Sequence, residues 1–114
     1  MVVVSATLLL TFLTMALMFH HAVMFGFKPG TTDEQVASMI EGLGALPATI
    51  PTIRRYNFGR DAGVNAGNSD FAVVAEFDDR DGYLVYRDHP AHVTVVRERI
   101  APFVAQRSAV QFER

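Results

Sequence analysis

The sequence contains no cysteine and no cluster of more than two basic residues, and both absences narrow the possible functions. Without cysteine the chain has no disulfide, no thiolate nucleophile and no sulfur ligand for a metal. The largest basic cluster is Arg54-Arg55, and the formal net charge is −2 at pH 7. Because nucleic-acid binding needs clustered positive charge, we expect no nucleic-acid partner.

Two common catalytic loops are also missing. A phosphate-binding loop places glycines between a strand and a helix, whereas the glycines of residues 59–63 precede another predicted strand. No Gly-x-Ser-x-Gly segment is present, which removes the nucleophile elbow of the α/β-hydrolases. We therefore expect no cofactor held by a phosphate loop and no serine-hydrolase chemistry.

The chain is long enough for one domain with one core. Its 114 residues are 50% apolar and 19% charged, which is typical of a globular protein. A chain of this size buries roughly two thirds of the surface of its unfolded state. That leaves room for one small pocket.

Residues 2–19 are uncharged and almost entirely apolar. Their length would nearly span a membrane, but no basic residues flank them as an anchor or a secretory signal would require. We treat residues 1–17 as an N-terminal extension with three alternatives: a start set too far upstream, an element packed on the domain, or an anchor. The domain proper is residues 18–114. We expect a cytoplasmic protein, with membrane anchoring or export through residues 1–19 as the alternative.

The first half of the domain alternates a strand, a helix and a strand. Residues 19–28 form the first predicted strand, with His21, Val23, Phe25 and Phe27 on one face. Its opposite face is also largely apolar, so we expect a cover on both sides of the sheet.

A helix follows this strand. Thr32 and Gln35 have the spacing of a capping box. The apolar residues of the helix recur at helical spacing: Val36, Met39, Ile40 and Leu43. Glycines and Pro47 end the helix, and Ile50-Pro51 leads into a second strand over residues 53–60.

The second half repeats the pattern in the order strand, helix, strand. Residues 61–69 are a Gly- and Asn-rich loop, and residues 70–78 alternate as a third strand. Asp78 or Asp79 caps a helix that runs to about Asp88, and Pro90 opens a second helical segment. The apolar residues of that segment are predicted to face inward: Val93, Val96, Ile100 and Phe103. Residues 107–113 form the fourth strand.

The order β-α-β-β-α-β predicts an α+β, ferredoxin-like fold with a four-stranded antiparallel sheet and helices on one face. The other face of the sheet is apolar and has no helix to cover it. We therefore expect a homodimer in which two sheets pack face to face.

Residues 86–92, Tyr-Arg-Asp-His-Pro-Ala-His, place a phenol and two imidazoles within about two turns of chain. Such groups transfer protons near neutral pH without a cofactor. His92 falls near the third position of the helix opened by Pro90, where the helix dipole favours the neutral imidazole. His89 is better placed to satisfy free N–H groups at the start of that helix.

Several segments together resemble the stress-responsive A/B barrel (Dabb) family. They are His21 to Lys28 with the following Pro-Gly, the Leu46-Pro47 and Ile50-Pro51 pairs, residues 53–59 and 72–77, and above all Tyr86-x-x-His89-Pro90-Ala91-His92. The resemblance covers about residues 18–113. It implies a dimeric α/β barrel that, in most members, has no assigned activity.

One plant branch of this family is a polyketide cyclase, which performs an intramolecular aldol condensation without a cofactor. The resemblance implies that Tyr86 and His92 match its catalytic pair and that His21 matches a histidine in the lining of its pocket. His89 and His92 also recur in members without a known reaction, so a purely structural role remains the alternative for both. Cofactor-independent monooxygenases share the topology, but no residue here selects oxygen chemistry.

These observations lead to one predicted site and two functions. The site is a mostly apolar pocket between sheet and helices, with Val23, Phe25, Phe71 and Phe77 as walls and Tyr86, His92 and His21 as its polar groups. The first function is binding of a small hydrophobic or aromatic molecule, or a stress-associated structural role. The alternative is a cofactor-free cyclase or lyase that uses Tyr86 and His92.

No metal is expected at this site. His89 and His92 are three residues apart, and His20, His21 or Asp88 are the other potential ligands. However, His20 and His21 are neighbours in a strand, so their side chains point to opposite faces of the sheet.

Overall fold

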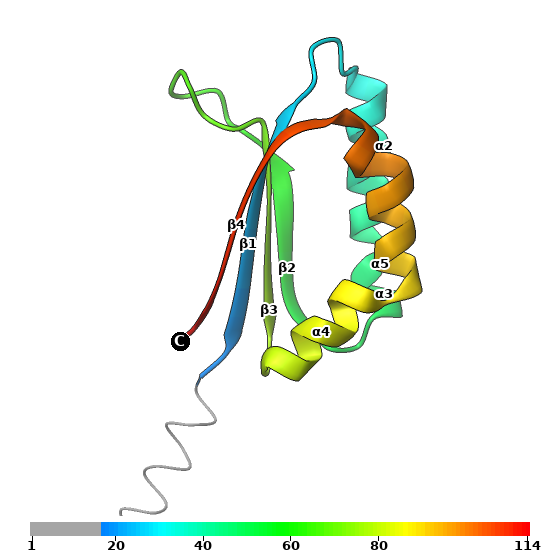
Figure 1. The fold of residues 1–114 in the computed structure, drawn as a ribbon, viewed down its shortest axis with the longest axis vertical. Helices are drawn as coiled ribbons and strands as arrows, with labels where there is room; N and C mark the ends of the chain where they lie inside the picture. Colours follow the sequence, from blue (N-terminus) through cyan, green and yellow to red (C-terminus); the bar gives the residue numbers. More distant parts are fainter. Residues whose placement is uncertain (1–16) are drawn as a thin grey trace, which may run out of the picture.

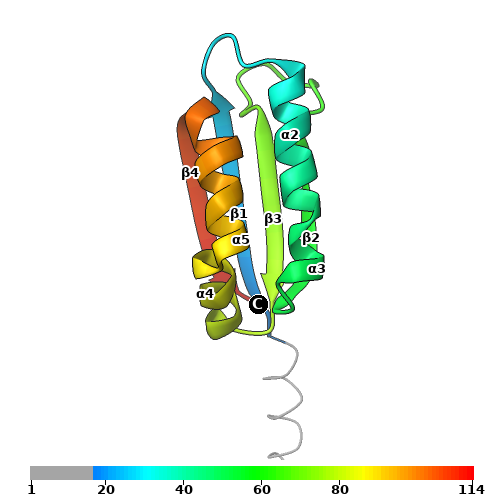
Figure 2. The same ribbon diagram turned by 90° about the vertical axis from the view of Figure 1, so that its right-hand side faces the viewer.

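The protein is a four-stranded antiparallel sheet with its helices on one face, as the computed structural model shows (Figures 1 and 2). The structure describes residues 17–114, so the predicted N-terminal extension lies outside it apart from Leu17. The elements are β1 (Phe19–Phe27), α2 (Asp33–Gly44), α3 (Leu46–Thr49), β2 (Ile53–Arg60), β3 (Phe71–Phe77), α4 (Arg80–Asp88), α5 (Pro90–Val95), η1 (Val96–Ile100), η2 (Ala101–Phe103) and β4 (Val104–Glu113). The predicted ferredoxin-like β-α-β-β-α-β order is confirmed.

The strands lie in the order β2-β3-β1-β4, so β1 and β3 are central. Strand β1 pairs with both β3 and β4, with Val23 opposite Val73 on one side and Ala109 on the other. Odd-numbered residues of β1 from Phe19 to Phe25 are buried against the helices, which confirms the predicted inner face. Both central strands are thereby covered on that face.

Helix α2 begins and packs as its sequence predicts. The Thr32 side chain accepts a hydrogen bond from the Gln35 N–H, and the Gln35 side chain accepts one from the Thr32 N–H. The capping box therefore satisfies two N–H groups that have no partner in the helix. Val36, Met39 and Leu43 are buried, whereas Ile40 lies at the edge of the stripe and stays partly exposed.

The second helical region changes its winding along its length. It is α-helical over Pro90–Val95, a wider π-helix over Val96–Ile100 and a tighter 3₁₀ turn over Ala101–Phe103. The wider turn changes which side chains share a face, so Val93 is 42% exposed and does not face inward with Ile100 as predicted. Strand β4 also begins at Val104 rather than residue 107, because Val104 already pairs with Phe27 of β1 past an irregularity in the register.

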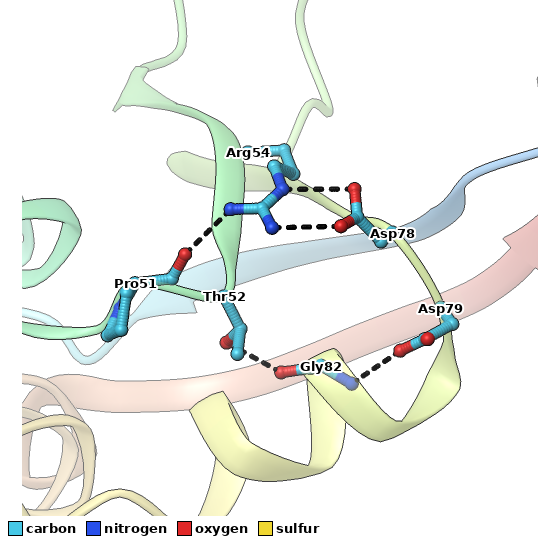
Figure 3. Close-up of polar contacts among 6 residues, drawn as sticks. All are labelled: Pro51, Thr52, Arg54, Asp78, Asp79 and Gly82. Atoms are coloured by element: carbon cyan, nitrogen blue, oxygen red, sulfur yellow. Dashed lines mark hydrogen bonds and ion pairs between the residues drawn. The ribbon is translucent and has the colours of Figure 1, made fainter. Parts of the chain in front are cut away.

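Polar contacts attach the start of α4 to the start of β2 (Figure 3). Asp79 is the N-cap of α4 and accepts a hydrogen bond from the Gly82 N–H at 2.8 Å. The Thr52 hydroxyl donates to the Gly82 carbonyl at 2.9 Å, and Arg54 forms a bidentate pair with Asp78. These contacts hold α4, which supplies several site residues, against the end of the sheet.

The core lies between the inner face of the sheet and the helices. Its largest fully buried side chains are Phe71, Phe77, Met39, Leu43, Leu46 and Ile50. Helices α2 and α5 approach closely at Gly42, where an added methyl group would lie 3.1 Å from a Val95 methyl carbon. Gly42 thus permits this spacing between the two helices.

The other side of the sheet, here called the outer sheet face, carries exposed apolar side chains: Met24, Val74, Val110 and Phe112. His20 lies beside them, stacked on Phe112 and 3.4 Å from a Glu76 carboxylate oxygen. Within residues 17–114 no helix lies over this face (Figure 1). None of the helices that the structure describes is both long enough and apolar enough to cross a membrane.

Candidate functional site

A cavity of about 360 Å³ lies between the inner face of the sheet and the helices. Five of the predicted site residues line it: His21, Val23, Phe25, Tyr86 and His92. The rest of its lining comes from α2, α4, η1, η2 and the inner faces of β3 and β4: Leu43, Val73, Tyr83, Arg87, Val96, Ile100, Ala101, Val104 and Arg107. The fold therefore brings the two imidazoles and the phenol of the prediction to one space.

The structure places Phe71 and Phe77 in the core rather than in the cavity lining. Both belong to β3, and both are on its inner face as predicted. Phe71 packs beside Phe25 and Phe27, while Phe77 packs beside the two tyrosines of α4. Other aromatic side chains cover these two phenylalanines. They therefore do not form the walls of the cavity, contrary to our expectation, but support those walls from within the core.

Tyr86 is the buried phenol of the cavity, with only 2% of its surface exposed. Its hydroxyl lies 2.8 Å from the hydroxyl of Tyr56 on β2. Burial and the neighbouring Tyr56 raise the pKa of Tyr86 far above its ordinary value, and burial raises the pKa of Tyr56 to about 12. Both phenols therefore remain protonated at neutral pH, so they act as hydrogen-bond donors rather than as bases.

The His92 ring lies against that of Tyr86, with 4.1 Å between the ring centroids and an angle of 32° between the ring planes. Its Nδ1 lies 3.0 Å from the Arg87 carbonyl oxygen, which can only accept, so Nδ1 carries the proton. In the neutral ring Nε2 is then the free, basic nitrogen. Burial lowers the pKa of His92, while the Arg87 carbonyl and Asp88 oppose part of this effect. His92 is therefore mainly neutral at pH 7, as a general base must be.

His21 is buried on β1, and Nε2 of the Gln111 amide donates a hydrogen bond to its Nδ1 at 2.8 Å. Burial, followed by the positive charge of Arg107 and then His92, lowers the pKa of His21 from 6.5 to about 4. The ring is therefore neutral at pH 7. With Nδ1 accepting, its Nε2 carries the proton and is a donor.

Sequence reasoning missed four polar residues at or behind the cavity: Tyr56, Tyr83, Arg87 and Arg107. Tyr83 had a signal, because it precedes Tyr86 by three residues and shares its helix face. Arg107 was predicted at the start of the last strand, but not in the site. Its position opposite Phe25 depends on the pairing register of β1 and β4.

His89 acts at the helix corner, as predicted. Its Nδ1 accepts a hydrogen bond from the Ala91 N–H at 3.0 Å, which caps α5. This leaves His92, not His89, as the imidazole of this segment at the cavity. Across residues 17–114 no three His, Asp or Glu side chains are close enough together to hold a metal ion.

Comparison with known proteins places this geometry in a family. The model of the Stress responsive A/B Barrel Domain matches residues 19–114. A stress-response A/B barrel domain-containing protein of Arabidopsis thaliana is 30% identical over 78 residues, which cover 66% of this chain and 68% of that protein.

Solved structures show the same fold. A dimeric ferredoxin-like protein of unknown function from Thermobifida fusca is 45% identical, with a TM-score of 0.79, and the match covers 84% of this chain and 90% of that one. The hydroxynitrile lyase of Passiflora edulis shares the fold at 18% identity, with a TM-score of 0.75, and the match covers 85% and 93%. The family match over nearly all of residues 17–114 decides the assignment. This chain belongs to the stress-responsive A/B barrel (Dabb) domain family.

Proposed function

We propose that this protein binds a small hydrophobic or aromatic molecule in the cavity between its sheet and helices. The cavity carries the proposal, because its volume of about 360 Å³ falls among small-molecule sites, which range over about 300–1,000 Å³. Its walls are mainly aliphatic and aromatic, including Val23, Phe25 and Ile100. Tyr86 and His92 add a few hydrogen-bonding groups that would orient a bound molecule.

A tryptophan placed in the cavity is expected to weaken binding strongly. Ala101 lines the cavity, so in Ala101→Trp the indole would fill space that a ligand needs. The measurement is the fluorescence rise of phenylnaphthylamine, a neutral aromatic probe, on titration with protein. We expect at least a tenfold loss of affinity in Ala101→Trp, which corresponds to about 1.4 kcal/mol.

Ala66→Trp is the matched control, because Ala66 is exposed in the loop before β3 and outside the cavity lining. It should bind the probe as the wild type does. If the wild type does not bind the probe, or if both variants bind equally well, the binding proposal fails.

A second candidate is a cofactor-free cyclase or lyase. The observation that favours it is the fixed tautomer of His92, whose Nδ1–H is held by the Arg87 carbonyl while Tyr86 lies against the ring. The related fold of a plant hydroxynitrile lyase supports it at the level of fold. In this reaction His92 Nε2 would remove a proton from a carbon beside a carbonyl, and Tyr86 would donate a hydrogen bond to the resulting enolate oxygen.

The enolate carbon would then attack a second carbonyl of the same molecule, which forms the new carbon–carbon bond. The alkoxide produced would take the proton back from the His92 imidazolium, which restores the neutral base. Tyr56 is a positioning residue here. If the Tyr56 hydroxyl donates to the Tyr86 oxygen, the proton of Tyr86 is directed elsewhere and is available to the substrate.

His92→Ala should remove the proton-transfer step. The test follows deuterium incorporation from D₂O into the methyl group of acetophenone by NMR, which reports proton removal beside a carbonyl whatever reaction follows. We expect the rate to fall by about 10²-fold or more. His20→Gln, on the outer sheet face, is the control and should exchange normally. Equal rates in the wild type and His92→Ala would remove His92 from catalysis, and no exchange above background in the wild type would eliminate this candidate.

The outer sheet face is the proposed homodimer interface. Its exposed apolar side chains, Met24, Val74, Val110 and Phe112, come from three adjacent strands. A second copy would cover them by the face-to-face packing of two sheets. The dimeric state of the Thermobifida relative supports this assembly.

A further inference from the structure

The charged side chains that line the cavity are all of one sign. Four basic residues line it, His21, Arg87, His92 and Arg107, of which the two arginines are charged at pH 7, and no aspartate or glutamate does. This bias is unexpected in a chain whose formal net charge is −2. Both arginines are exposed to solvent at the rim of the cavity, so the lining offers positive charge, and no negative charge, to a ligand that enters.

The two arginines of the lining differ in their partners. Arg87 donates two hydrogen bonds to the Asp88 carboxylate, at 2.8 and 3.1 Å, so its charge is already balanced. Arg107 makes no ion pair and no side-chain hydrogen bond to any other residue in the range 17–114. Among these residues its guanidinium is therefore the cation of the cavity lining whose N–H groups are free to donate hydrogen bonds to a ligand.

Arg107 is on the inner face of the sheet and not on the outer sheet face. It pairs with Phe25 across the β1–β4 ladder, and Phe25 belongs to the buried, helix-facing side of β1. Arg107 is also close enough to His21 for its positive charge to disfavour protonation of that ring. A ligand group at Arg107 would thus lie beside the polar end of the cavity, with the aliphatic walls beyond it.

We propose that the natural ligand is an amphipathic carboxylate, an aromatic or aliphatic molecule whose carboxylate pairs with Arg107 while its apolar body fills the cavity. A guanidinium binds a carboxylate through two parallel hydrogen bonds, which gives both attraction and orientation. Val23, Val96 and Ile100 contact the apolar body. This inference rests on the proposed binding function and adds the chemical class of the ligand.

The test compares two ligands of the same shape that differ in charge. Naphthylacetate carries a carboxylate, and naphthylacetamide replaces it with a neutral amide. Each is titrated at pH 7 against the protein with bound phenylnaphthylamine, and displacement of the probe gives its affinity. We expect naphthylacetate to bind about tenfold more tightly than the amide, as for a charge-assisted hydrogen-bonded pair. This preference should shrink as salt is added.

Arg107→Gln should remove the preference by weakening naphthylacetate alone, and naphthylacetamide should bind as before. Arg80→Gln is the matched control, since Arg80 is an exposed arginine at the start of α4 and outside the cavity lining. It should keep the full preference. A second readout is the NMR titration of His21, whose pKa should rise when naphthylacetate neutralises Arg107 in the wild type but not in Arg107→Gln.

The outcomes separate this inference from the binding proposal. If phenylnaphthylamine binds and Ala101→Trp blocks it, the binding function holds. The carboxylate assignment is then overturned if the two naphthyl ligands bind equally, if neither displaces the probe, or if Arg107→Gln keeps the preference. If the probe itself does not bind, both proposals fail together.

Discussion

Replacing Phe77 with alanine is expected to lower the free energy of unfolding by about 3–5 kcal/mol. The Phe77 side chain is completely buried at the end of β3, where its ring lies 5.7 Å from that of Tyr83 and 5.2 Å from that of Tyr86, between ring centroids. Alanine would leave a cavity beneath α4. The hydrogen bond from the Thr52 hydroxyl to the Gly82 carbonyl holds that helix against the start of β2 and would limit its collapse into the space.

Urea unfolding followed by circular dichroism measures this loss, with all proteins at one concentration because association would add to the apparent stability. Val85→Ala is the control, since Val85 is on the same helix, α4, but 49% exposed. It should change the free energy by about 0.5 kcal/mol or less. A loss below about 1 kcal/mol for Phe77→Ala would show that Phe77 is not a principal support of α4.

Val110→Asp is expected to convert the proposed dimer into a monomer. Val110 is 56% exposed on the outer sheet face, in the edge strand β4 and opposite Ala22 of β1 in the ladder. In a face-to-face dimer the substitution occurs twice, once on each sheet, because the interface has twofold symmetry. Burying unpaired carboxylates costs several kcal/mol, so we expect the dissociation constant to rise by about 10³-fold or more.

Light scattering at micromolar concentration gives the mass directly. The wild type should have twice the 12.6 kDa mass of one chain, and Val110→Asp should have the mass of one. Val64→Asp makes the same substitution at an 81% exposed loop position and should remain dimeric. Met24→Lys, at a second position of the outer sheet face, should also dissociate. A monomeric wild type, or a dimeric Val110→Asp protein, would refute this interface.

Phe77 and Val110 lie on opposite faces of one sheet, Phe77 on the inner face and Val110 on the outer sheet face. This difference between the two faces explains how the fold creates a site. The inner face of β1 is buried under helices and directs His21 toward Tyr86 of α4, which lies against His92 of α5. The outer sheet face contributes nothing to the cavity, so the proposed assembly and the proposed ligand binding can be tested separately. Variants of the outer sheet face should therefore leave the cavity lining in place.

The resemblance to the family implied that His21 shares a site with Tyr86 and His92. The sequence by itself determined the order of elements, the capping box at Thr32 and the role of His89. These features depend on residues a few positions apart, or on periodicity within one element, so they can be read along the chain. The resemblance to the family rested on such local motifs, and the family match over residues 19–114 confirmed it.

Only the tertiary structure decided which distant side chains meet. Tyr56 contacts Tyr86 across 30 positions and Gln111 contacts His21 across 90, because strand register and helix placement bring them together. The same long-range packing placed Phe71 and Phe77 in the core, and the π-helix turned Val93 outward. The pairing of β4 with β1 places Arg107 opposite Phe25, on the face of the sheet that borders the cavity. Alternation along a strand gives the face of each side chain, but not the neighbour that it meets there.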